Sequence, residues 1–327
     1  MKKIVVKPSK RYAGLILPAI VFFMSTMVAR AQPAQTAQLV LDLRMTLGEG
    51  SIWDFRKAEL LFVDIENGKL FTYTEQGQLW VQNTGQRVSA VVPAANGMLI
   101  LAMQKGIYSY RRKDSTFHLL VVNPADTQSF RFNDGKCDPS GRLWIGTMSL
   151  DYKKGSGSLY RLGEGGSLLR MKSGVTISNG LVWSADKRTM YYIDTPTREI
   201  VAFSYDDKTG RIDSGKVAIR IPPEMGGPDG MTIDAEGKLW IAHYGGAAVR
   251  RWDPVHGELL ETIHVPAKNV TSCAFGGPDL DILFITTARQ GNSAEDLQKY
   301  PYSGGLFSCK PGVKGVRANL FGQNPSK

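Results

Sequence analysis

The sequence lacks the short motifs that mark several common kinds of catalytic site. It contains no G-x-S-x-G, no H-E-x-x-H, no C-x-x-C and no complete phosphate-binding G-x-x-x-x-G-K-[ST], because Val217 follows the G-x-x-x-x-G-K at 210–216. The missing nucleophile elbow argues against a serine hydrolase. Histidine is also scarce, and the four copies, at positions 118, 243, 256 and 264, have no metal-ligand spacing. We interpret His243, in the stretch AHYGG, as a packed or surface residue rather than a catalytic one.

Cysteine is almost as rare, with copies only at positions 137, 273 and 309. Three is an odd number, so these residues do not form the framework of a disulfide-rich scaffold. Cys137 and Cys273 lie within repeated strands of different blades, as described below. We expect all three to be small buried residues, with one disulfide as the alternative.

Basic residues are concentrated at the N-terminus. Residues 1–31 carry six Lys or Arg and no acid, so without them the net charge falls from +10 to +4, with 34 basic against 30 acidic residues. The remainder has no basic run or basic–aromatic stripe of the kind that binds nucleic acid. Nucleic acid is therefore excluded as an expected partner.

The same N-terminal segment has the layout of a secretory signal peptide. A basic leader precedes an uncharged, largely apolar run over residues 12–29, and Ala29-Arg30-Ala31 offers a cleavage site before Gln32. We expect a secreted protein, periplasmic or extracellular, that is free of the membrane after cleavage. An uncleaved membrane anchor is the alternative, because the run nearly reaches spanning length. No Cys follows the run, so a lipid anchor is not supported.

One pattern recurs six times along the rest of the chain. The clearest copies are DGMTIDAEGKLWIA (229–242), DGKCDPSGRLWIG (134–146) and NGLVWSADKRTMYYID (179–194). Looser copies are EGSIWDFRKAELLFVD (49–64), SAVVPAANGMLILA (89–102) and TSCAFGGPDLDILFIT (271–286). Each copy predicts a strand, a tight turn and a second strand.

Repeats of this kind, spaced by about 40–50 residues, are typical of a β-propeller with one four-stranded blade per repeat. The sequence therefore predicts an all-β fold, a six-bladed β-propeller with a central metal-binding channel. We expect a single domain over residues 32–327, because one blade cannot bury its faces alone. Strand-like segments 37–43 and 304–312 flank the repeats, and we expect one of them to complete the last blade.

The first residues of the six copies would form a ring around the channel. They are Glu49, Ser89, Asp134, Asn179, Asp229 and Thr271. Asp-Gly and Asn-Gly pairs often serve only to shape turns, but here they precede the apolar strand and the turn comes later. Carboxylates that converge on a channel repel one another unless a cation holds them. Such oxygens favour a hard cation such as Ca²⁺.

Four motifs in this order resemble those of the regucalcin (senescence marker protein) and gluconolactonase family. They are LGEGSIWD, RFNDGKCDPSGRLWIGTM, ISNGLVWSADKRTMYYID and GGPDGMTIDAEGKLWIAHYGG, and the likeness covers about residues 45–310. The resemblance implies a six-bladed propeller with a divalent cation at the channel mouth, and lactone hydrolysis as the activity. Ca²⁺ is the favoured cofactor, with Zn²⁺, Mn²⁺ or Mg²⁺ as alternatives.

The resemblance also implies roles for particular residues. It places the metal on Glu49, Asn179 and Asp229. Three substrate contacts are implied at Arg131, Asn133 and Asp151, the last in a loop shorter than that of relatives. A structural ion pair of Arg131 with Asp134 and a solvated loop charge at Asp151 are the alternatives.

A sugar lactone is a cyclic ester, so its hydrolysis needs a polarised carbonyl and an activated water. Three protein ligands leave positions open on a Ca²⁺ ion that takes about 6–8 oxygens, and the lactone oxygen can occupy one of them. The general base is Asp229 by the resemblance, or else Asp134, which we do not count as a ligand. Alternative functions are hydrolysis of aryl esters or phosphotriesters at the same site, and a non-catalytic binding propeller that uses the metal only structurally.

Overall fold

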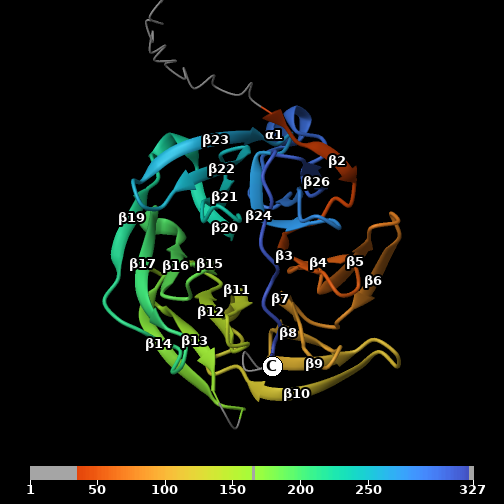
Figure 1. Ribbon diagram of the computed structural model, residues 1–327. Helices are drawn as coiled ribbons and strands as arrows, with labels where there is room; N and C mark the ends of the chain where they lie inside the picture. Colours follow the sequence, from red (N-terminus) through yellow and green to blue (C-terminus); the bar gives the residue numbers. More distant parts are fainter. Residues whose placement is uncertain (1–34, 164–165, 324–327) are drawn as a thin grey trace, which may run out of the picture. The chain divides into compact units, whose positions relative to one another are not determined.

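The six repeated patterns fold into six small sheets arranged in a ring (Figure 1), and their strands are antiparallel except where β1 (Gln35–Thr36) pairs parallel with β23 (Glu258–His264). The structure is a computed structural model that describes residues 35–163 and 166–323. In each sheet the two strands of the sequence repeat are the innermost pair. The predicted six-bladed β-propeller is confirmed.

The first three blades have four consecutive strands each. Blade 1 contains β3 (Gly48–Asp54), β4 (Glu59–Asp64), β5 (Lys69–Thr74) and β6 (Leu79–Asn83). Blade 2 contains β7 (Val88–Pro93), β8 (Leu99–Met103), β9 (Gly106–Arg111) and β10 (Thr116–Val122). Blade 3 contains β11 (Phe130–Cys137), β12 (Leu143–Ser149), β13 (Gly157–Leu162) and β14 (Leu168–Val175).

The other three blades carry additions. Blade 4 contains β15 (Ser178–Trp183), β16 (Thr189–Asp194) and β17 (Glu199–Asp206), and β17 pairs with both β18 (Arg211–Ile212) and β19 (Lys216–Arg220). Blade 5 contains β20 (Gly227–Ile233), β21 (Leu239–Tyr244), β22 (Ala248–Asp253), β23 (Glu258–His264) and the short β1 (Gln35–Thr36). Blade 6 contains β24 (Asn269–Gly276), β25 (Ile282–Ala288), β26 (Leu306–Cys309) and β2 (Gln38–Leu41). A helix, α1 (Ala294–Lys299), lies between β25 and β26.

The ring closes in blade 6, where strands from both ends of the chain share one sheet. β2 forms its outer edge and pairs antiparallel with β26, so that Leu39 lies opposite Phe307 (Figure 1). We expected one of the segments 37–43 and 304–312 to complete this blade, and both do. Pairing β2, from the N-terminal part of the described chain, with β26, its last strand, completes the four-stranded sheet and ties the ring together.

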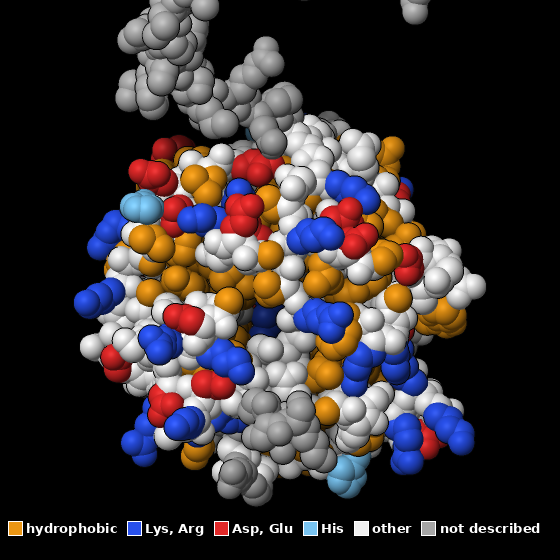
Figure 2. Space-filling model, viewed as in Figure 1, with side chains coloured by type: hydrophobic (Ala, Val, Ile, Leu, Met, Phe, Trp, Pro, Cys, Tyr) orange, Lys and Arg blue, Asp and Glu red, His pale blue; other side chains and the backbone are white. Residues whose placement is uncertain are grey.

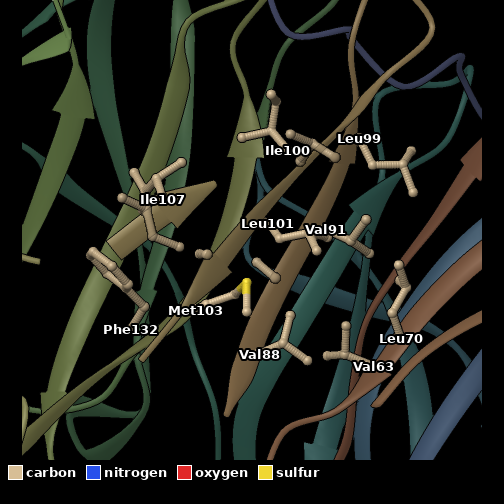
Figure 3. Close-up of a cluster of buried hydrophobic side chains, with 14 of the residues drawn as sticks. Val63, Leu70, Val88, Val91, Leu99, Ile100, Leu101, Met103, Ile107 and Phe132 are labelled. Atoms are coloured by element: carbon tan, nitrogen blue, oxygen red, sulfur yellow. The ribbon is translucent and has the colours of Figure 1, made fainter. Parts of the chain in front are cut away.

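Apolar side chains fill the spaces between blades. One cluster joins blades 1, 2 and 3, and its members include Val63, Leu70, Leu101, Met103 and Phe132 (Figure 3). Val63, Leu101 and Phe132 are fully buried, and each such side chain contributes about 1.5–3 kcal/mol by leaving water. Because the cluster draws on three repeats, no blade could retain this core alone.

A segment beyond blade 6 crosses one end of the channel (Figure 1). We call residues 313–323 the C-terminal strap. It bonds blade 6 through Gly315 N to Leu280 O (2.8 Å) and blade 2 through Phe321 N to Pro93 O (2.9 Å). It also bonds blade 3 through Gly322 N to Gly141 O (2.9 Å). The strap therefore links blades that face one another across the ring.

Three further expectations concern the cysteines, the leader and membranes. Cys137, Cys273 and Cys309 are buried and free, as predicted, and no disulfide joins them. The predicted signal peptide, residues 1–31, lies outside the described residues. Within residues 35–163 and 166–323, no helix has the length and apolar character needed to cross a membrane.

Candidate active site and metal centre

A β-bulge accompanies the first residue of every repeat. The register of the innermost strand shifts near that residue in each of the six blades, for example between Asn179 and Leu181 in β15 and between Pro228 and Met231 in β20. A bulge interrupts the ladder and redirects a side chain. At the bulge the side chains no longer alternate between the two faces of the sheet, and the side chain of the ring residue is directed towards the channel.

Glycine follows the ring residue in four copies, and its lack of a side chain is needed where blades approach closely. A Cβ atom on Gly180 would lie 2.7 Å from the carbonyl oxygen of Asp229, and one on Gly230 would lie 2.9 Å from Ser272. The Asn-Gly and Asp-Gly pairs therefore do more than shape turns. They let neighbouring inner strands bring their polar side chains together.

Two ring members are used for joining blades. The Ser89 hydroxyl donates to Phe132 O (2.6 Å), and the Thr271 hydroxyl donates to Gly48 O (2.5 Å). Both acceptors belong to the next blade. This leaves one amide, Asn179, and three carboxylates as the chemically available part of the ring.

The three carboxylates are Glu49, Asp134 and Asp229, with only 6, 5 and 5 % of their surfaces exposed. Burial raises the pKa of Glu49 to about 8, and the charge of Asp134 adds to the effect. The pKa of Asp229 is raised well above its ordinary value by burial, then by Glu49 and Asp134. The carboxylates are thus buried, close and mutually repulsive.

Two fully buried oxygen atoms of this group have no hydrogen-bond partner among the described residues. Asp134 Oδ1 accepts from Gly135 N (2.7 Å) and Glu49 Oε2 accepts from Gly50 N (3.0 Å). Asp134 Oδ2 and Asp229 Oδ1 are buried and unpaired. Buried polar atoms are normally paired, so these two indicate that the ring is built around something that binds oxygen.

A divalent cation fits this set. Carboxylate and amide oxygens without a thiolate or imidazole suit a hard cation such as Ca²⁺. In the part of the chain that the structure describes, no three His, Cys, Asp or Glu side chains form a metal cluster by themselves. An amide oxygen beside two carboxylates would complete such a set, and Glu49, Asn179 and Asp229 are the residues that would hold the ion.

Asn179 is held by a chain of hydrogen bonds. Its Oδ1 accepts from Asn133 Nδ2 (3.0 Å), and its own Nδ2 donates to Thr195 Oγ1 (2.8 Å). Thr195 in turn donates to Pro228 O (2.8 Å), next to Asp229. The chain leaves the remaining lone pair of Asn179 Oδ1 free for a cation. Thr195, which follows β16 directly, therefore positions the Asn179 side chain. This role was not predicted from the sequence.

Arg131 and Asn133 are both buried beside the ring. Arg131 Nη1 donates to Phe132 O (3.0 Å) and to Asn133 Oδ1. Both hydrogens of Asn133 Nδ2 are used, one on Asn179 and one on Ser178 O (2.7 Å). Asn133 therefore orients a candidate ligand, and only its Oδ1 remains to accept from a substrate. Arg131 has no carboxylate partner among the described residues.

The ring opens onto a cavity of about 280 Å³, which we call the ring cavity. Its wall contains Glu49, Arg131, Asn133, Asn179 and Asp229, together with Leu47, Met148, Tyr152, Ile177, Thr195, Tyr244 and Gln290. The predicted ligands and two of the predicted substrate contacts thus face one space.

Two of the predicted site residues do not line this wall. Asp134 lies behind it, buried beside Glu49 and Asp229. Asp151 is exposed and accepts a hydrogen bond from Ser149. The neighbouring Tyr152 lines the cavity instead, so one step along a turn decides which side chain faces the cavity.

Tyr152, Tyr244 and Gln290 form a rim that the repeat pattern did not reveal. Tyr244 donates to Gln290 O (2.8 Å), and Gln290 Nε2 donates to Tyr152 (3.3 Å). These residues come from blades 5, 6 and 3. Of these three residues, only Tyr244 could have been found from the sequence pattern, because it ends β21, the second strand of the fifth repeat.

At the other end of the channel a smaller cavity of about 80 Å³ is lined by Lys136 and Asn319, the latter from the C-terminal strap. Lys136 donates to Met231 O, and its charge partly offsets the burial that raises the pKa of Asp134. Figure 2 shows a basic side chain recessed near the middle of one face. The strap and Lys136 therefore separate the carboxylates from solvent on this side.

The fold and the site together define a six-bladed β-propeller with an oxygen-lined site at one end of its channel. Residues 47–289 match the model of the SMP-30/Gluconolactonase/LRE-like region, and the chain belongs to that family.

Three relatives place the chain within the family. It is 41% identical over 279 residues, 84% of this chain and 94% of the relative, to a Bacillus subtilis protein assigned provisionally as a sugar lactone lactonase, YvrE. It is 39% identical to regucalcin of Danio rerio, over 85% of this chain and 96% of the relative. The solved structure of a calcium-binding regucalcin from Agrobacterium tumefaciens superposes with a TM-score of 0.84 at 29% identity, covering 88% of this chain and 98% of that one.

Proposed function

We propose that this protein is a metal-dependent hydrolase that opens sugar lactones. The observation that carries the proposal is the shared wall of the ring cavity, where Glu49, Asn179 and Asp229 face the same space as Arg131. A purely structural cation would need no guanidinium beside it. The name of the Bacillus subtilis relative points to sugar lactones as the substrate class.

A divalent cation held by Glu49, Asn179 and Asp229 would polarise the carbonyl of the bound ester when present. Arg131 binds hydroxyl oxygens of the sugar through the guanidinium nitrogens that the fold leaves unused. Asn133 keeps Asn179 in its orientation. Tyr152 and Tyr244 wall the cavity and limit the poses of a small ring.

In the reaction, a water oxygen bonds to the carbonyl carbon and the ring C–O bond breaks. One proton of the water leaves through a carboxylate, and the released alkoxide oxygen takes up a proton to give an open-chain hydroxy acid. We assign the proton acceptor to Asp229, because its Oδ1 is unpaired and it lines the cavity. Asp134 stands behind the wall and would keep negative charge beside Asp229.

A pH-stat assay tests the proposal. Purified protein is stripped with a chelator, Ca²⁺, Zn²⁺, Mn²⁺ and Mg²⁺ are restored one at a time, and acid release from gluconolactone is recorded. We expect turnover to disappear on chelation and to return when one of the metals is restored. Faster turnover of an aryl ester or a phosphotriester would instead assign an esterase, and no turnover of any ester would leave a binding propeller.

The proposal includes export, which rests on the basic leader, the apolar run and the Ala29-Arg30-Ala31 site. N-terminal sequencing of protein from a periplasmic or extracellular fraction is expected to begin at Gln32. An intact leader recovered with membranes would support an anchor instead.

A further inference from the structure

A second hollow adjoins the ring cavity. It has a volume of about 350 Å³ and shares Arg131, Met148, Tyr152 and Gln290 with that cavity. Its own lining residues are Thr46, Glu66, Arg87 and Leu150. We call it the Arg87 lobe. Because four residues line both spaces, a ligand in the ring cavity can extend into the lobe.

Two guanidinium groups face this lobe around a single carboxylate. Arg87 Nε donates to Glu66 Oε2 (2.8 Å), which leaves the Nη groups of Arg87 without a hydrogen bond among the described residues. The Arg87 side chain is 36% exposed. Arg131 is 5% exposed, and its hydrogen bonds within the described part of the chain use only Nη1.

The two cations lie within electrostatic reach of each other. Burial lowers the pKa of Arg131, Glu66 raises it more than any other charge does, and Arg87 lowers it further. Glu49, on the ring-cavity side, also raises the pKa of Arg131. Within the lining of the lobe itself, two guanidinium groups face one carboxylate, which leaves a net positive charge there. Guanidinium groups bind phosphate and carboxylate oxygens through paired N–H donors.

We propose that the Arg87 lobe binds an anionic substituent of the substrate, so that the substrate is a sugar lactone carrying a phosphate or a carboxylate remote from its ester. This inference rests on the proposed function and narrows it. The lactone ring occupies the ring cavity, and its acidic group lies between Arg87 and Arg131. Glu66 holds Arg87 in place and moderates the positive charge.

The test compares three lactones at low ionic strength. Gluconolactone is neutral, its derivative with phosphate on the terminal carbon carries phosphate, and the monolactone of glucaric acid carries a carboxylate. We expect wild-type kcat/KM to favour at least one acidic lactone by about 10-fold or more, mainly through KM, and salt to reduce the preference. The phosphate and carboxylate arms identify which anion the lobe prefers.

Substitutions of the basic and the acidic residue of the lobe are expected to change the preference ratio, kcat/KM for the acidic lactone divided by that for gluconolactone, in opposite directions. Arg87→Gln is expected to reduce the preference ratio by about 10-fold, with Arg87→Lys intermediate, because lysine keeps the charge without the paired donors. Glu66→Gln is expected to raise the ratio. The matched control is Arg111→Gln on the same blade, where the arginine pairs with Asp114 (3.2 Å) away from both cavities; it is expected to leave the ratio unchanged.

A wild-type ratio near one, or equal ratios in Arg87→Gln and Arg111→Gln, overturns the inference while leaving lactone hydrolysis intact. If no lactone is hydrolysed, the proposed function fails separately. The lobe is then tested by calorimetry with neutral glucitol, its terminal phosphate ester and gluconate. Tighter binding of either anion that is lost in Arg87→Gln supports the anion site, and equal binding of all three rejects it.

Discussion

Replacing Asp229 and Asp134 one at a time distinguishes a residue that binds the metal ion from one that acts only in proton transfer or in structure. Asp229→Asn and Asp134→Asn each remove one buried negative charge and keep an oxygen atom. Burial, and then the charge of Asp134, raise the pKa of Glu49 to about 8. Above that pH Glu49 is ionised, and in the metal-free protein both changes relieve its repulsion with the neighbouring carboxylate. We therefore expect both metal-free variants to gain stability, by about 1–3 kcal/mol.

Added metal distinguishes the two variants. If the wild-type protein binds Ca²⁺ as proposed, it is expected to gain about 2.7 kcal/mol at a Ca²⁺ concentration of 100 times its Kd. If loss of the Asp229 charge weakens binding by about 100-fold, the same concentration stabilises Asp229→Asn by only about 0.4 kcal/mol. Asp134→Asn is expected to keep nearly the whole gain, because Asp134 does not line the cavity.

The assay is thermal unfolding with and without Ca²⁺, paired with lactone turnover at saturating metal. Asp114→Asn, at an exposed position, is the control. Turnover of Asp229→Asn should fall by about 10²–10⁴-fold. An undiminished Ca²⁺ shift in Asp229→Asn would remove it from the ligand set, and an equal loss in Asp134→Asn would add Asp134. If both variants keep full turnover, the chemistry does not occur on this ring.

Three further predictions concern the ring, the core and the strap. Gly180→Ala should weaken Ca²⁺ binding measured by calorimetry, because a Cβ atom would press on the Asp229 carbonyl; unchanged affinity would mean that the blades separate freely. Burial, then the nearby Arg250 charge, lower the pKa of His243 from 6.5 to about 3. Above pH 6.5 His243 is neutral in both states and does not lower the free energy of unfolding. Between pH 6.5 and 3 it is protonated in the unfolded chain but stays neutral in the folded one, so stability falls as the pH is lowered. Wild-type stability in urea should fall by about 2 kcal/mol more than that of His243→Gln between pH 6.5 and 5, and equal losses would contradict the assignment. Ending the chain after Gly312 removes the strap and should lower the free energy of unfolding by a few kcal/mol, since each backbone bond contributes about 0.5–1.5 kcal/mol; an unchanged urea midpoint would show that the strap adds nothing.

Much of the fold was predictable because its units are local in sequence. Each repeat encodes a hairpin, and the spacing of the hairpins predicts the number of blades. The closing segments at 37–43 and 304–312 were recognisable as strands, but their pairing with each other was not. That pairing joins residues more than half the chain apart, so only the closure of the ring brings them into one sheet.

The candidate site likewise has features that the sequence repeat predicts and features that depend on contacts between blades. Equivalent positions in a repeat have equivalent places in the ring, so Glu49, Asn179 and Asp229 could be expected around one channel. The sequence could not show that Ser89 and Thr271 bond neighbouring blades. Nor could it show that Asp151 faces outward while Tyr152 faces the cavity, because loop conformation depends on the surrounding packing.

By itself, then, the sequence determined the repeat, the six-bladed architecture and the ring of oxygen-bearing residues, because each of these follows from a pattern repeated along the chain. The tertiary structure alone decided which ring atoms remain unpaired, such as Asp229 Oδ1, and which distant residues complete the cavity. It alone brought Gln290 to Tyr152, Arg87 near Arg131 and the C-terminal strap across the channel. Such contacts join different blades, and no local pattern specifies how side chains from separate blades meet.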